Sequence, residues 1–124
     1  MVGLILGIVS EEMLWHGFLN SNLNLTSGTI NNDICECTYT IVGRIIFFDI
    51  GQGKTILKYN QKQRIGAVPN RLRPIHDLDF EVMGNGRNYI VSFVDGAMYI
   101  KPISDNLPES TPPYMYINIC YLLK

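Results

Sequence analysis

The residues of this chain with the clearest capacity for chemistry are two histidines and a row of three carboxylates. His16 and His76 lie far apart in the sequence, and neither lies near a motif such as G-x-S-x-G, which presents a catalytic serine. Asp77, Asp79 and Glu81 alternate along an expected strand, so all three carboxylates would share one face. A row of like charges is more typical of a solvated strand face than of a glycosidase carboxylate pair. The sequence therefore predicts a protein that is not an enzyme.

The three cysteines do not form a recognisable metal site. Cys35 and Cys37 form a C-x-C pair whose thiols would point to the same face of a strand, and Cys120 lies near the other end of the chain. A zinc site requires about four ligands at characteristic spacing, which the cysteines and histidines do not supply. Residues 51–55 read GQGKT but lack the first glycine of a phosphate-binding loop and a following helix, so they predict a hairpin turn. We expect buried, reduced cysteines and no metal or other cofactor.

Basic residues are concentrated between positions 51 and 76, a segment without any acidic residue. Such a segment could bind a phosphate-bearing polymer or a nucleic acid. The net charge of −1, and the lack of aromatic side chains alternating with the basic ones, argue against nucleic acid. The alternative is a solvated loop in which Arg73 pairs with Asp77 or Asp79 across a proline turn. The basic residues of the segment are Lys54, Lys58, Lys62, Arg64, Arg71 and Arg73.

Saccharide binding requires an aromatic ring for the apolar face of the sugar and planar hydrogen-bonding groups for its hydroxyls. The sole tryptophan lies beside a histidine, and several tyrosines, Tyr114 and Tyr116 among them, fall on expected strands. Any one of these aromatic side chains is more often a core or interface residue than a ligand contact. On chemical grounds the candidate ligand-binding residues are Trp15, His16, Arg71, Arg73, His76, Asp77, Tyr89 and Tyr99.

The sequence predicts an all-β chain, because β-branched and aromatic runs alternate with turn signals and no amphipathic helix is evident. The longest run, residues 34–50, contains Gly43 as an expected bulge or bend. Turns are expected at 51–53, at 84–86 and at Asp95-Gly96, the last of type I′. Residues 60–76 and 102–113 are expected to be irregular connections. The expected strands are 2–9, 23–26, 34–50, 55–59, 78–83, 88–94, 97–100 and 113–123.

About eight to ten short strands in one domain, residues 1–124, predict an antiparallel β-sandwich or barrel that is jelly-roll-like. The chain is 47% hydrophobic and only 17% charged, which is little charge for a small monomer with much surface to cover. The last strand is apolar on both faces, with Met115 and Ile117 pointing one way and Tyr114 and Tyr116 the other. We therefore expect part of the surface to be buried between subunits.

The order of loops and strands from about Cys37 onward carries a family resemblance. The loop at 68–74 reads VPNRLRP, and it is followed by a strand and then by a hairpin closed at Asp95-Gly96. This order resembles the head (tip) domains of phage tail-fibre and baseplate receptor-binding proteins, which carry a Leu-Pro-x-x-x-Arg-Pro loop. Pro69 and Arg73-Pro74 match that loop, and Val68 replaces its leucine.

The resemblance implies a homotrimer around a three-fold axis, with the C-terminal strand near that axis. It also implies binding to a host cell-surface saccharide, through weak sites multiplied by three-fold avidity. Further implications are contacts with other tail or baseplate proteins and a place in the virion, in the phage tail. Two alternatives stay open: a non-binding structural trimerisation or capping domain of a virion fibre, and a small glycan hydrolase.

The N-terminal segment is apolar, but it has no basic residue before Arg44, and Glu11 and Glu12 follow the apolar run directly. A signal peptide begins with positive charge, and the run is too short to cross a bilayer. We therefore expect synthesis in the host cytoplasm without a signal peptide, and no membrane insertion. Residues 1–20 are expected to form a stalk or an inter-subunit segment.

Overall fold

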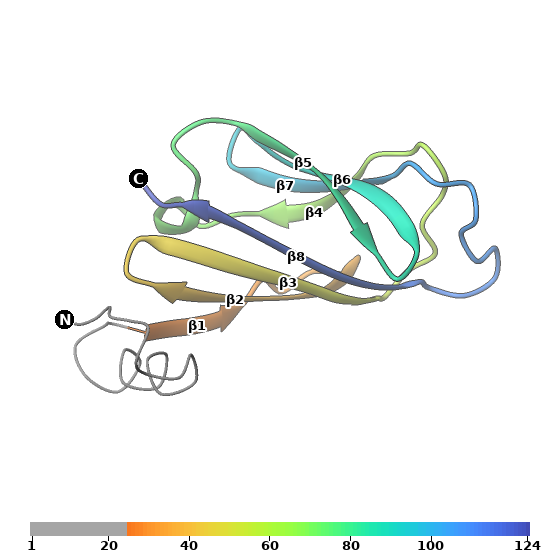
Figure 1. Cartoon of the computed structure of the whole chain (residues 1–124), viewed down its shortest axis with the longest axis horizontal. Coiled ribbons are helices and arrows are strands. Elements are labelled where there is room, and N and C mark those ends of the chain that lie inside the picture. The colour runs from red at the N-terminus through yellow and green to blue at the C-terminus, as the bar shows by residue number, and fades with distance from the viewer. Residues whose placement is uncertain (1–24) are drawn as a thin grey trace, which may run out of the picture.

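The computed structural model describes residues 25–124, which form two four-stranded antiparallel sheets packed face to face (Figure 1). Sheet A has the strand order β1-β2-β3-β8, and sheet B has the order β4-β7-β6-β5. The expected all-β sandwich is therefore confirmed. The strands are β1 Leu25–Thr29, β2 Cys35–Val42, β3 Ile45–Gly53, β4 Gln63–Ala67, β5 Leu78–Gly84, β6 Arg87–Val94, β7 Ala97–Pro102 and β8 Tyr114–Leu122.

Sheet B is a Greek key, because β5, β6 and β7 follow one another through hairpins and β4 lies beside β7. Sheet A is a meander of β1, β2 and β3, and β8 pairs with β3 at its edge. The two sheets meet along one side, where β5 contacts β8. At this β5–β8 seam a Cβ atom on Gly84 would overlap the carbonyl oxygen of Met115, so the two backbones touch directly.

The hairpins of sheet B are closed by turns whose central residues have positive φ. Asn85 and Gly86 have φ values of 51° and 77°, and Asp95 and Gly96 have the same pair of values. Positive φ at both central positions defines a type I′ turn, whose twist matches that of the flanking strands. The type I′ turn expected at Asp95-Gly96 is therefore confirmed.

The long strand expected at residues 34–50 is in fact a hairpin. Val42 pairs with Ile45, so the chain reverses through Gly43 and Arg44, and Gly43 has a φ of 64°. A two-residue turn with a positive φ at its first position is a common hairpin connection. The strand propensity on either side is the same for a bulged strand and for a hairpin, which is why the sequence did not separate the two.

The prediction for residues 51–76 was wrong in three places. Residues 51–53, expected as a turn, continue β3, because Gly53 pairs with Cys35. Residues 55–59 form a loop rather than a strand, and the loop is anchored by the buried Leu57. Residues 63–67, expected to be irregular, form β4 because β7 supplies their pairing partner, and Asn70–Leu72 form a short 3-10 helix.

The strand expected at 2–9 and the stalk expected at 1–20 lie outside the described residues, and the strand expected at 23–26 overlaps β1 from Leu25 onward. Within residues 25–124, no helix has the length and the apolar character that crossing a bilayer would require.

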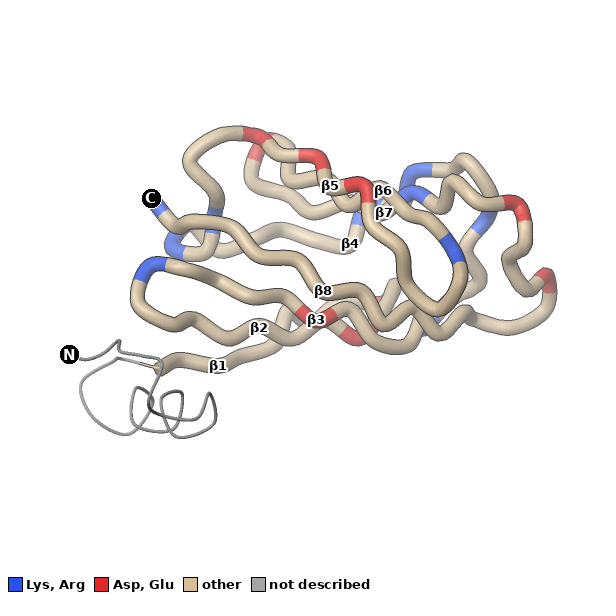
Figure 2. The backbone as a smooth tube through the Cα atoms, in the orientation of Figure 1, with Lys and Arg blue, Asp and Glu red and all other residues tan. Residues whose placement is uncertain are grey.

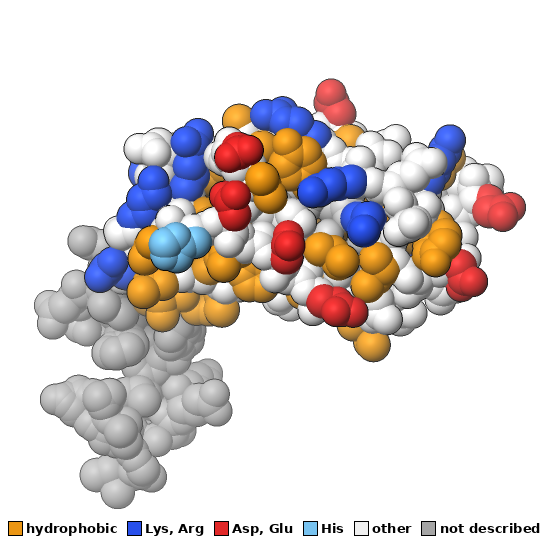
Figure 3. Space-filling view, turned by 90° about the horizontal axis from the view of Figure 1, so that it is seen from above, with side chains coloured by type: hydrophobic (Ala, Val, Ile, Leu, Met, Phe, Trp, Pro, Cys, Tyr) orange, Lys and Arg blue, Asp and Glu red, His pale blue; other side chains and the backbone are white. Residues whose placement is uncertain are grey.

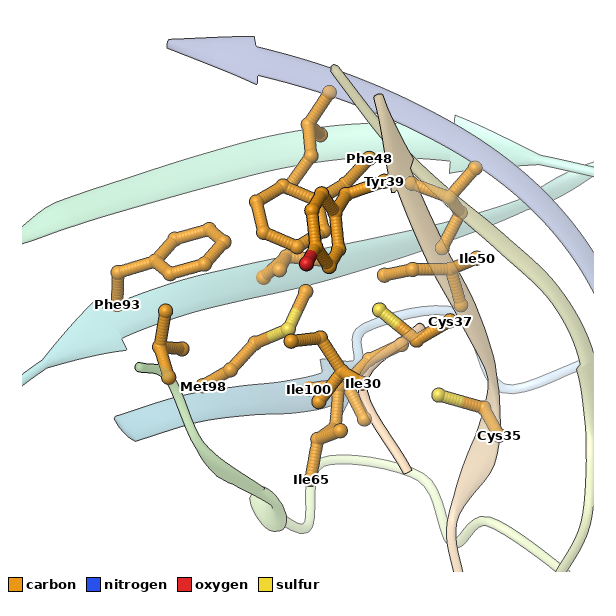
Figure 4. Packing of buried hydrophobic residues seen from close by; sticks show 14 of the residues in the cluster. Ile30, Cys35, Cys37, Tyr39, Phe48, Ile50, Ile65, Phe93, Met98 and Ile100 are labelled. Atoms are coloured by element: carbon orange, nitrogen blue, oxygen red, sulfur yellow. The ribbon is translucent and has the colours of Figure 1, made fainter. Parts of the chain in front are cut away.

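The core lies between the sheets and is filled mainly by the strand side chains that point inward, which are every second residue along a strand (Figure 4). Strand β8 shows the pattern over its whole length, since buried and exposed residues alternate from Tyr114 to Leu122. Its inner face therefore packs in the core as expected, and its outer face is exposed in the single chain. The buried residues of β8 are Met115, Ile117, Ile119 and Tyr121.

An aromatic cluster centred on Phe48 joins the two sheets. The ring centroid of Phe48 lies 5.6 Å from that of Phe93 on sheet B, 5.8 Å from that of Tyr121 and 6.1 Å from that of Tyr39. Phe93 and Tyr121 are themselves 5.0 Å apart, at an interplanar angle of 71°. Tilted and edge-on rings at these separations are favourable, so the cluster stabilises the packing of one sheet on the other.

The outer faces of the two sheets differ in charge. Glu36 and Asp49 are the only charged residues in the four strands of sheet A (Figure 2). On the face of the molecule formed by sheet B, positive, negative and apolar side chains are mixed (Figure 3). A mixed charged surface is typical of solvent exposure, whereas a sheet face with exposed apolar side chains and few charges is typical of a surface that binds a partner.

Candidate functional site

A pocket of about 430 Å³ lies between the proline loop at 68–77 and the β6–β7 turn. We call it the Arg73 pocket. Its wall combines charged groups from the loop, the turn and Lys124 with apolar side chains of the loop and the core, so it is more polar than most small-ligand pockets. The lining residues are Val68, Arg73, Pro74, Ile75, His76, Asp77, Phe93, Asp95, Gly96, Ala97 and Lys124.

The proline loop is held to the core at two points. The side chain of Leu72 is completely buried, and the hydroxyl of Tyr121 donates a hydrogen bond to the Leu72 carbonyl oxygen. The backbone N–H of Val68 donates to the carbonyl oxygen of Gly96 at 2.8 Å, which joins the loop to the β6–β7 turn. An irregular segment tied down in this way is a rigid support for a binding site.

Arg73 is positioned by the loop and by the turn together. Its Nε donates a 2.8 Å hydrogen bond to the Val68 carbonyl oxygen, rather than pairing with the carboxylate of Asp77 or Asp79. Its guanidinium lies over Gly96, where a Cβ atom would come within 2.6 Å of Cζ. Glycine at position 96 therefore serves two purposes, because it provides the φ of 77° and it leaves space for the guanidinium.

The charged groups of the Arg73 pocket are of both signs. Arg73 and Lys124 provide positive charge, and Asp77 and Asp95 provide negative charge. The Oδ1 atom of Asp77 accepts a hydrogen bond of 3.3 Å from the backbone N–H of Asp95, which links the two sides of the pocket. His76 adds a group that donates and accepts. Such a wall suits an uncharged ligand with many hydroxyl groups better than a polyanion, because it offers both donors and acceptors and its charges offset each other.

The structure brings together three of the residues selected from the sequence, Arg73, His76 and Asp77. Arg71 is exposed and does not line the pocket, and its guanidinium donates a 3.4 Å hydrogen bond to the Tyr39 hydroxyl. Trp15 and His16 lie outside the described residues.

The two selected tyrosines lie apart from the pocket. Tyr99 is half-buried on the outer face of sheet B, with the Lys62 ammonium 4.9 Å from its ring centroid. Tyr89 is fully buried on the inner face of the same sheet, so it packs in the core rather than at a binding surface. Burial raises the pKa of the Tyr89 hydroxyl, although the nearby Arg87 guanidinium opposes that effect.

Sequence reasoning missed Asp95 and Lys124 as pocket residues. Asp95 was noted only for the turn that it forms with Gly96, and Lys124 follows the last strand. The signal that would have found Asp95 is topological, since the β4–β7 pairing brings the β6–β7 turn beside the proline loop. That pairing involves a strand that the sequence did not predict. Lys124 reaches the pocket because its neighbour Leu123 pairs with Pro74 of the loop.

The cysteines divide into two buried thiols and one exposed thiol. Burial raises the pKa of Cys35 to about 11 and that of Cys37 to about 12, so both remain protonated near neutral pH and react slowly. Cys120 was expected to be buried, but it lies exposed on the outer face of β8. The described residues contain no group of three or more His, Cys, Asp or Glu side chains that could hold a metal ion.

The outer face of sheet A has two apolar ends separated by a polar row. At the Gly43 end, four residues that pair across all four strands form what we call the aliphatic row, and Phe47 flanks it. At the other end lie Tyr114 and Tyr116, the tyrosine pair. The polar row between them is Thr29, Thr38, Asp49 and Asn118, and the aliphatic row is Leu25, Val42, Ile45 and Leu122.

No protein-family model matches this sequence, and a search of curated proteins gives no significant match. The functional interpretation therefore depends on the Arg73 pocket and on the outer face of sheet A.

Proposed function

We propose that this chain is a saccharide-binding head domain of a phage or prophage tail-fibre receptor-binding protein. The observation that carries the proposal is the Arg73 pocket, because the loop on which the family resemblance depends also forms its wall, through Val68, Arg73 and Pro74. The mixed donors and acceptors of that wall suit the hydroxyls of a host-surface glycan, and the exposed Ile75 offers an apolar contact. In this proposal the protein acts in the virion beside other tail or baseplate proteins.

The proposal includes assembly as a homotrimer through the aliphatic row. Leu25, Ile45 and Leu122 are 42–50% exposed, and no charged side chain lies in the row that they share with Val42. A second copy is the favoured occupant, because the whole chain is low in charge for a monomer and the resemblance places the C-terminal strand near a three-fold axis. Three copies of a weak pocket would then bind a repetitive surface with high avidity.

The saccharide proposal is tested by titrating the purified chain with neutral oligosaccharides prepared from bacterial cell walls. We expect Asp77→Ala to weaken binding about tenfold, because it removes a charged hydrogen-bonding group from the pocket wall. The matched control is Asp79→Ala, which changes another exposed carboxylate, outside the pocket, and should bind as the wild type does. Equal binding by all three proteins would refute the pocket as the site, and shortening of the oligosaccharide would favour the hydrolase alternative.

The trimer is tested by light scattering coupled to size-exclusion chromatography. We expect the wild-type particle to have three times the 14.1 kDa mass of the chain. Leu122→Asp should give monomers, since it introduces three like charges into an apolar interface. The control is Met83→Asp, which changes an apolar side chain that is 70% exposed on sheet B and should leave the trimer intact.

A wild-type chain that is monomeric at micromolar concentration would refute the assembly. A trimer that binds no saccharide would instead favour the structural alternative, a trimerisation or capping domain, for which the aliphatic row is the supporting observation.

A further inference from the structure

The tyrosine pair is a second exposed apolar feature of sheet A, and the trimer contact proposed at the aliphatic row gives it no role. Tyr114 is 48% exposed and Tyr116 is 63% exposed. Their ring centroids lie 5.8 Å apart with an interplanar angle of 18°, so the two rings form one stacked aromatic unit. The polar row separates this unit from the aliphatic row, and a contact between copies at the aliphatic row therefore leaves the tyrosines free.

The backbone at Tyr116 is in a conformation that L side chains rarely adopt. Ile50 pairs with Ile117 and Gln52 pairs with Tyr114, so β8 has one more residue than β3 between these pairs. This is a β-bulge, and Tyr116 within it has a φ of 52°. Glycine is the residue that usually takes left-handed backbone in a bulge. A large aromatic side chain at such a position points to a use that outweighs the backbone strain, because strained residues are concentrated at ligand-binding sites.

Polar groups share the outer face of sheet A with the tyrosine pair, on neighbouring positions of β2, β3 and β8. The Glu36 carboxylate lies over Gly51, where a Cβ atom would come within 2.9 Å of Oε1, and it accepts a 3.1 Å hydrogen bond from the Gln52 N–H. Gly51 is the β3 residue opposite the bulge. In the adjacent polar row, Asn118 of β8 lies directly opposite Asp49. Carboxylate and amide groups beside exposed rings are the combination that binds sugar hydroxyls and the sugar's apolar face together.

We infer that the tyrosine pair, with Glu36 and Asn118, is a binding platform for a neutral hexose of the glycan. The aromatic rings would take the apolar C–H face of the pyranose, and the carboxylate and the amide would bind its hydroxyls. The two carboxylates, Glu36 and Asp49, exclude acidic sugars by like-charge repulsion. This inference rests on the proposed saccharide-binding function and deepens it, because it names the sugar class and adds a subsite on the opposite sheet from the Arg73 pocket.

The experiment is ligand-observed saturation-transfer NMR on the full chain, followed by titration. The probes are methyl β-D-glucopyranoside, methyl β-D-galactopyranoside and the acidic methyl glycoside of N-acetylneuraminic acid. We expect the neutral sugars to bind through the C–H protons of one ring face and the acidic sugar not to bind. Tyr116→Gly should weaken binding about tenfold, because the ring contact is lost. It should leave the melting temperature unchanged or raised, because glycine relieves the backbone strain.

A combined result separates this site from the Arg73 pocket. Weaker binding in Tyr116→Gly, whether or not Asp77→Ala also weakens binding, with binding retained in the conservative variant Tyr116→Phe, would support the platform. Binding that Asp77→Ala removes and Tyr116→Gly leaves unchanged would overturn the platform and keep the proposed function. A lower melting temperature of Tyr116→Gly together with unchanged binding would show a purely structural tyrosine and would also overturn it. Failure of every saccharide to bind the wild type would overturn both.

Discussion

Gly84→Ala is expected to destabilise this protein by at least about 3 kcal/mol, and it is the smallest substitution for which we expect so large an effect. Gly84 ends β5 at the β5–β8 seam, where an added Cβ atom would overlap the carbonyl oxygen of Met115 and approach the Ile117 side chain within 2.8 Å. A flexible side chain could move away from the methyl group, but a carbonyl in a paired strand cannot. The two sheets would have to separate along the side on which they meet. Urea denaturation followed by circular dichroism measures the loss.

The matched control for the seam is Gly66→Ala on β4. A Cβ atom at Gly66 would meet only the Asn32 side chain, at 4.0 Å, and the residue has no positive φ. Alanine there should be neutral or should stabilise the fold by up to about 1 kcal/mol, since it restricts the unfolded chain. Similar midpoints for the two variants would show that β5 and β8 do not touch as closely as the structure indicates.

The parts of the fold that the sequence predicts well are those governed by local chemistry. Alternation of apolar residues and the turn at Asp95-Gly96 predict β6 and β7 to within two residues at either end. Alternation likewise predicts β8, because every second residue from Met115 onward must face the core. These signals extend over a few neighbouring residues, so no knowledge of the rest of the chain is needed to interpret them.

The parts that the sequence does not predict depend on pairing between distant segments. Gln63–Ala67 has a weak strand signal, and it forms β4 only because β7 lies beside it and Ile65 enters the core. The β5–β8 seam is likewise not predictable from the sequence, although Gly84 at one end of it is a residue whose small size the seam requires. Propensity does not contain this information, because a strand is stabilised mainly by its neighbours.

The candidate site likewise has a part that the sequence predicts and a part that depends on the topology of the fold. Arg73, His76 and Asp77 were selected by residue type, and they fall together because they are close in sequence. Asp95 joins them through the topology of sheet B. The positive φ of Tyr116 follows from a bulge in the β3–β8 register, so sequence reasoning could include the tyrosine as an aromatic candidate but could not detect the strain that distinguishes it.

Adjacent phenylalanines on β3 allow a direct test of which face of sheet A is the core. Phe48 is 1% exposed at the centre of the aromatic cluster, whereas Phe47 is 40% exposed on the outer face beside the aliphatic row. Because successive strand residues point to opposite faces, a register shifted by one residue would exchange their environments. Replacing each phenylalanine with alanine, in Phe47→Ala and in Phe48→Ala, therefore tests the register of sheet A.

Phe48→Ala is expected to lower the free energy of unfolding by about 3–5 kcal/mol, because it leaves a cavity between Phe93 and Tyr121 that the rigid sheets cannot close. Phe47→Ala should cost about 1 kcal/mol or less at low protein concentration, where contacts between subunits contribute least. Urea titrations of both variants at several concentrations provide the comparison. Equal losses would contradict the assigned faces, and a loss in Phe47→Ala that grows with concentration would place Phe47 in the interface between copies.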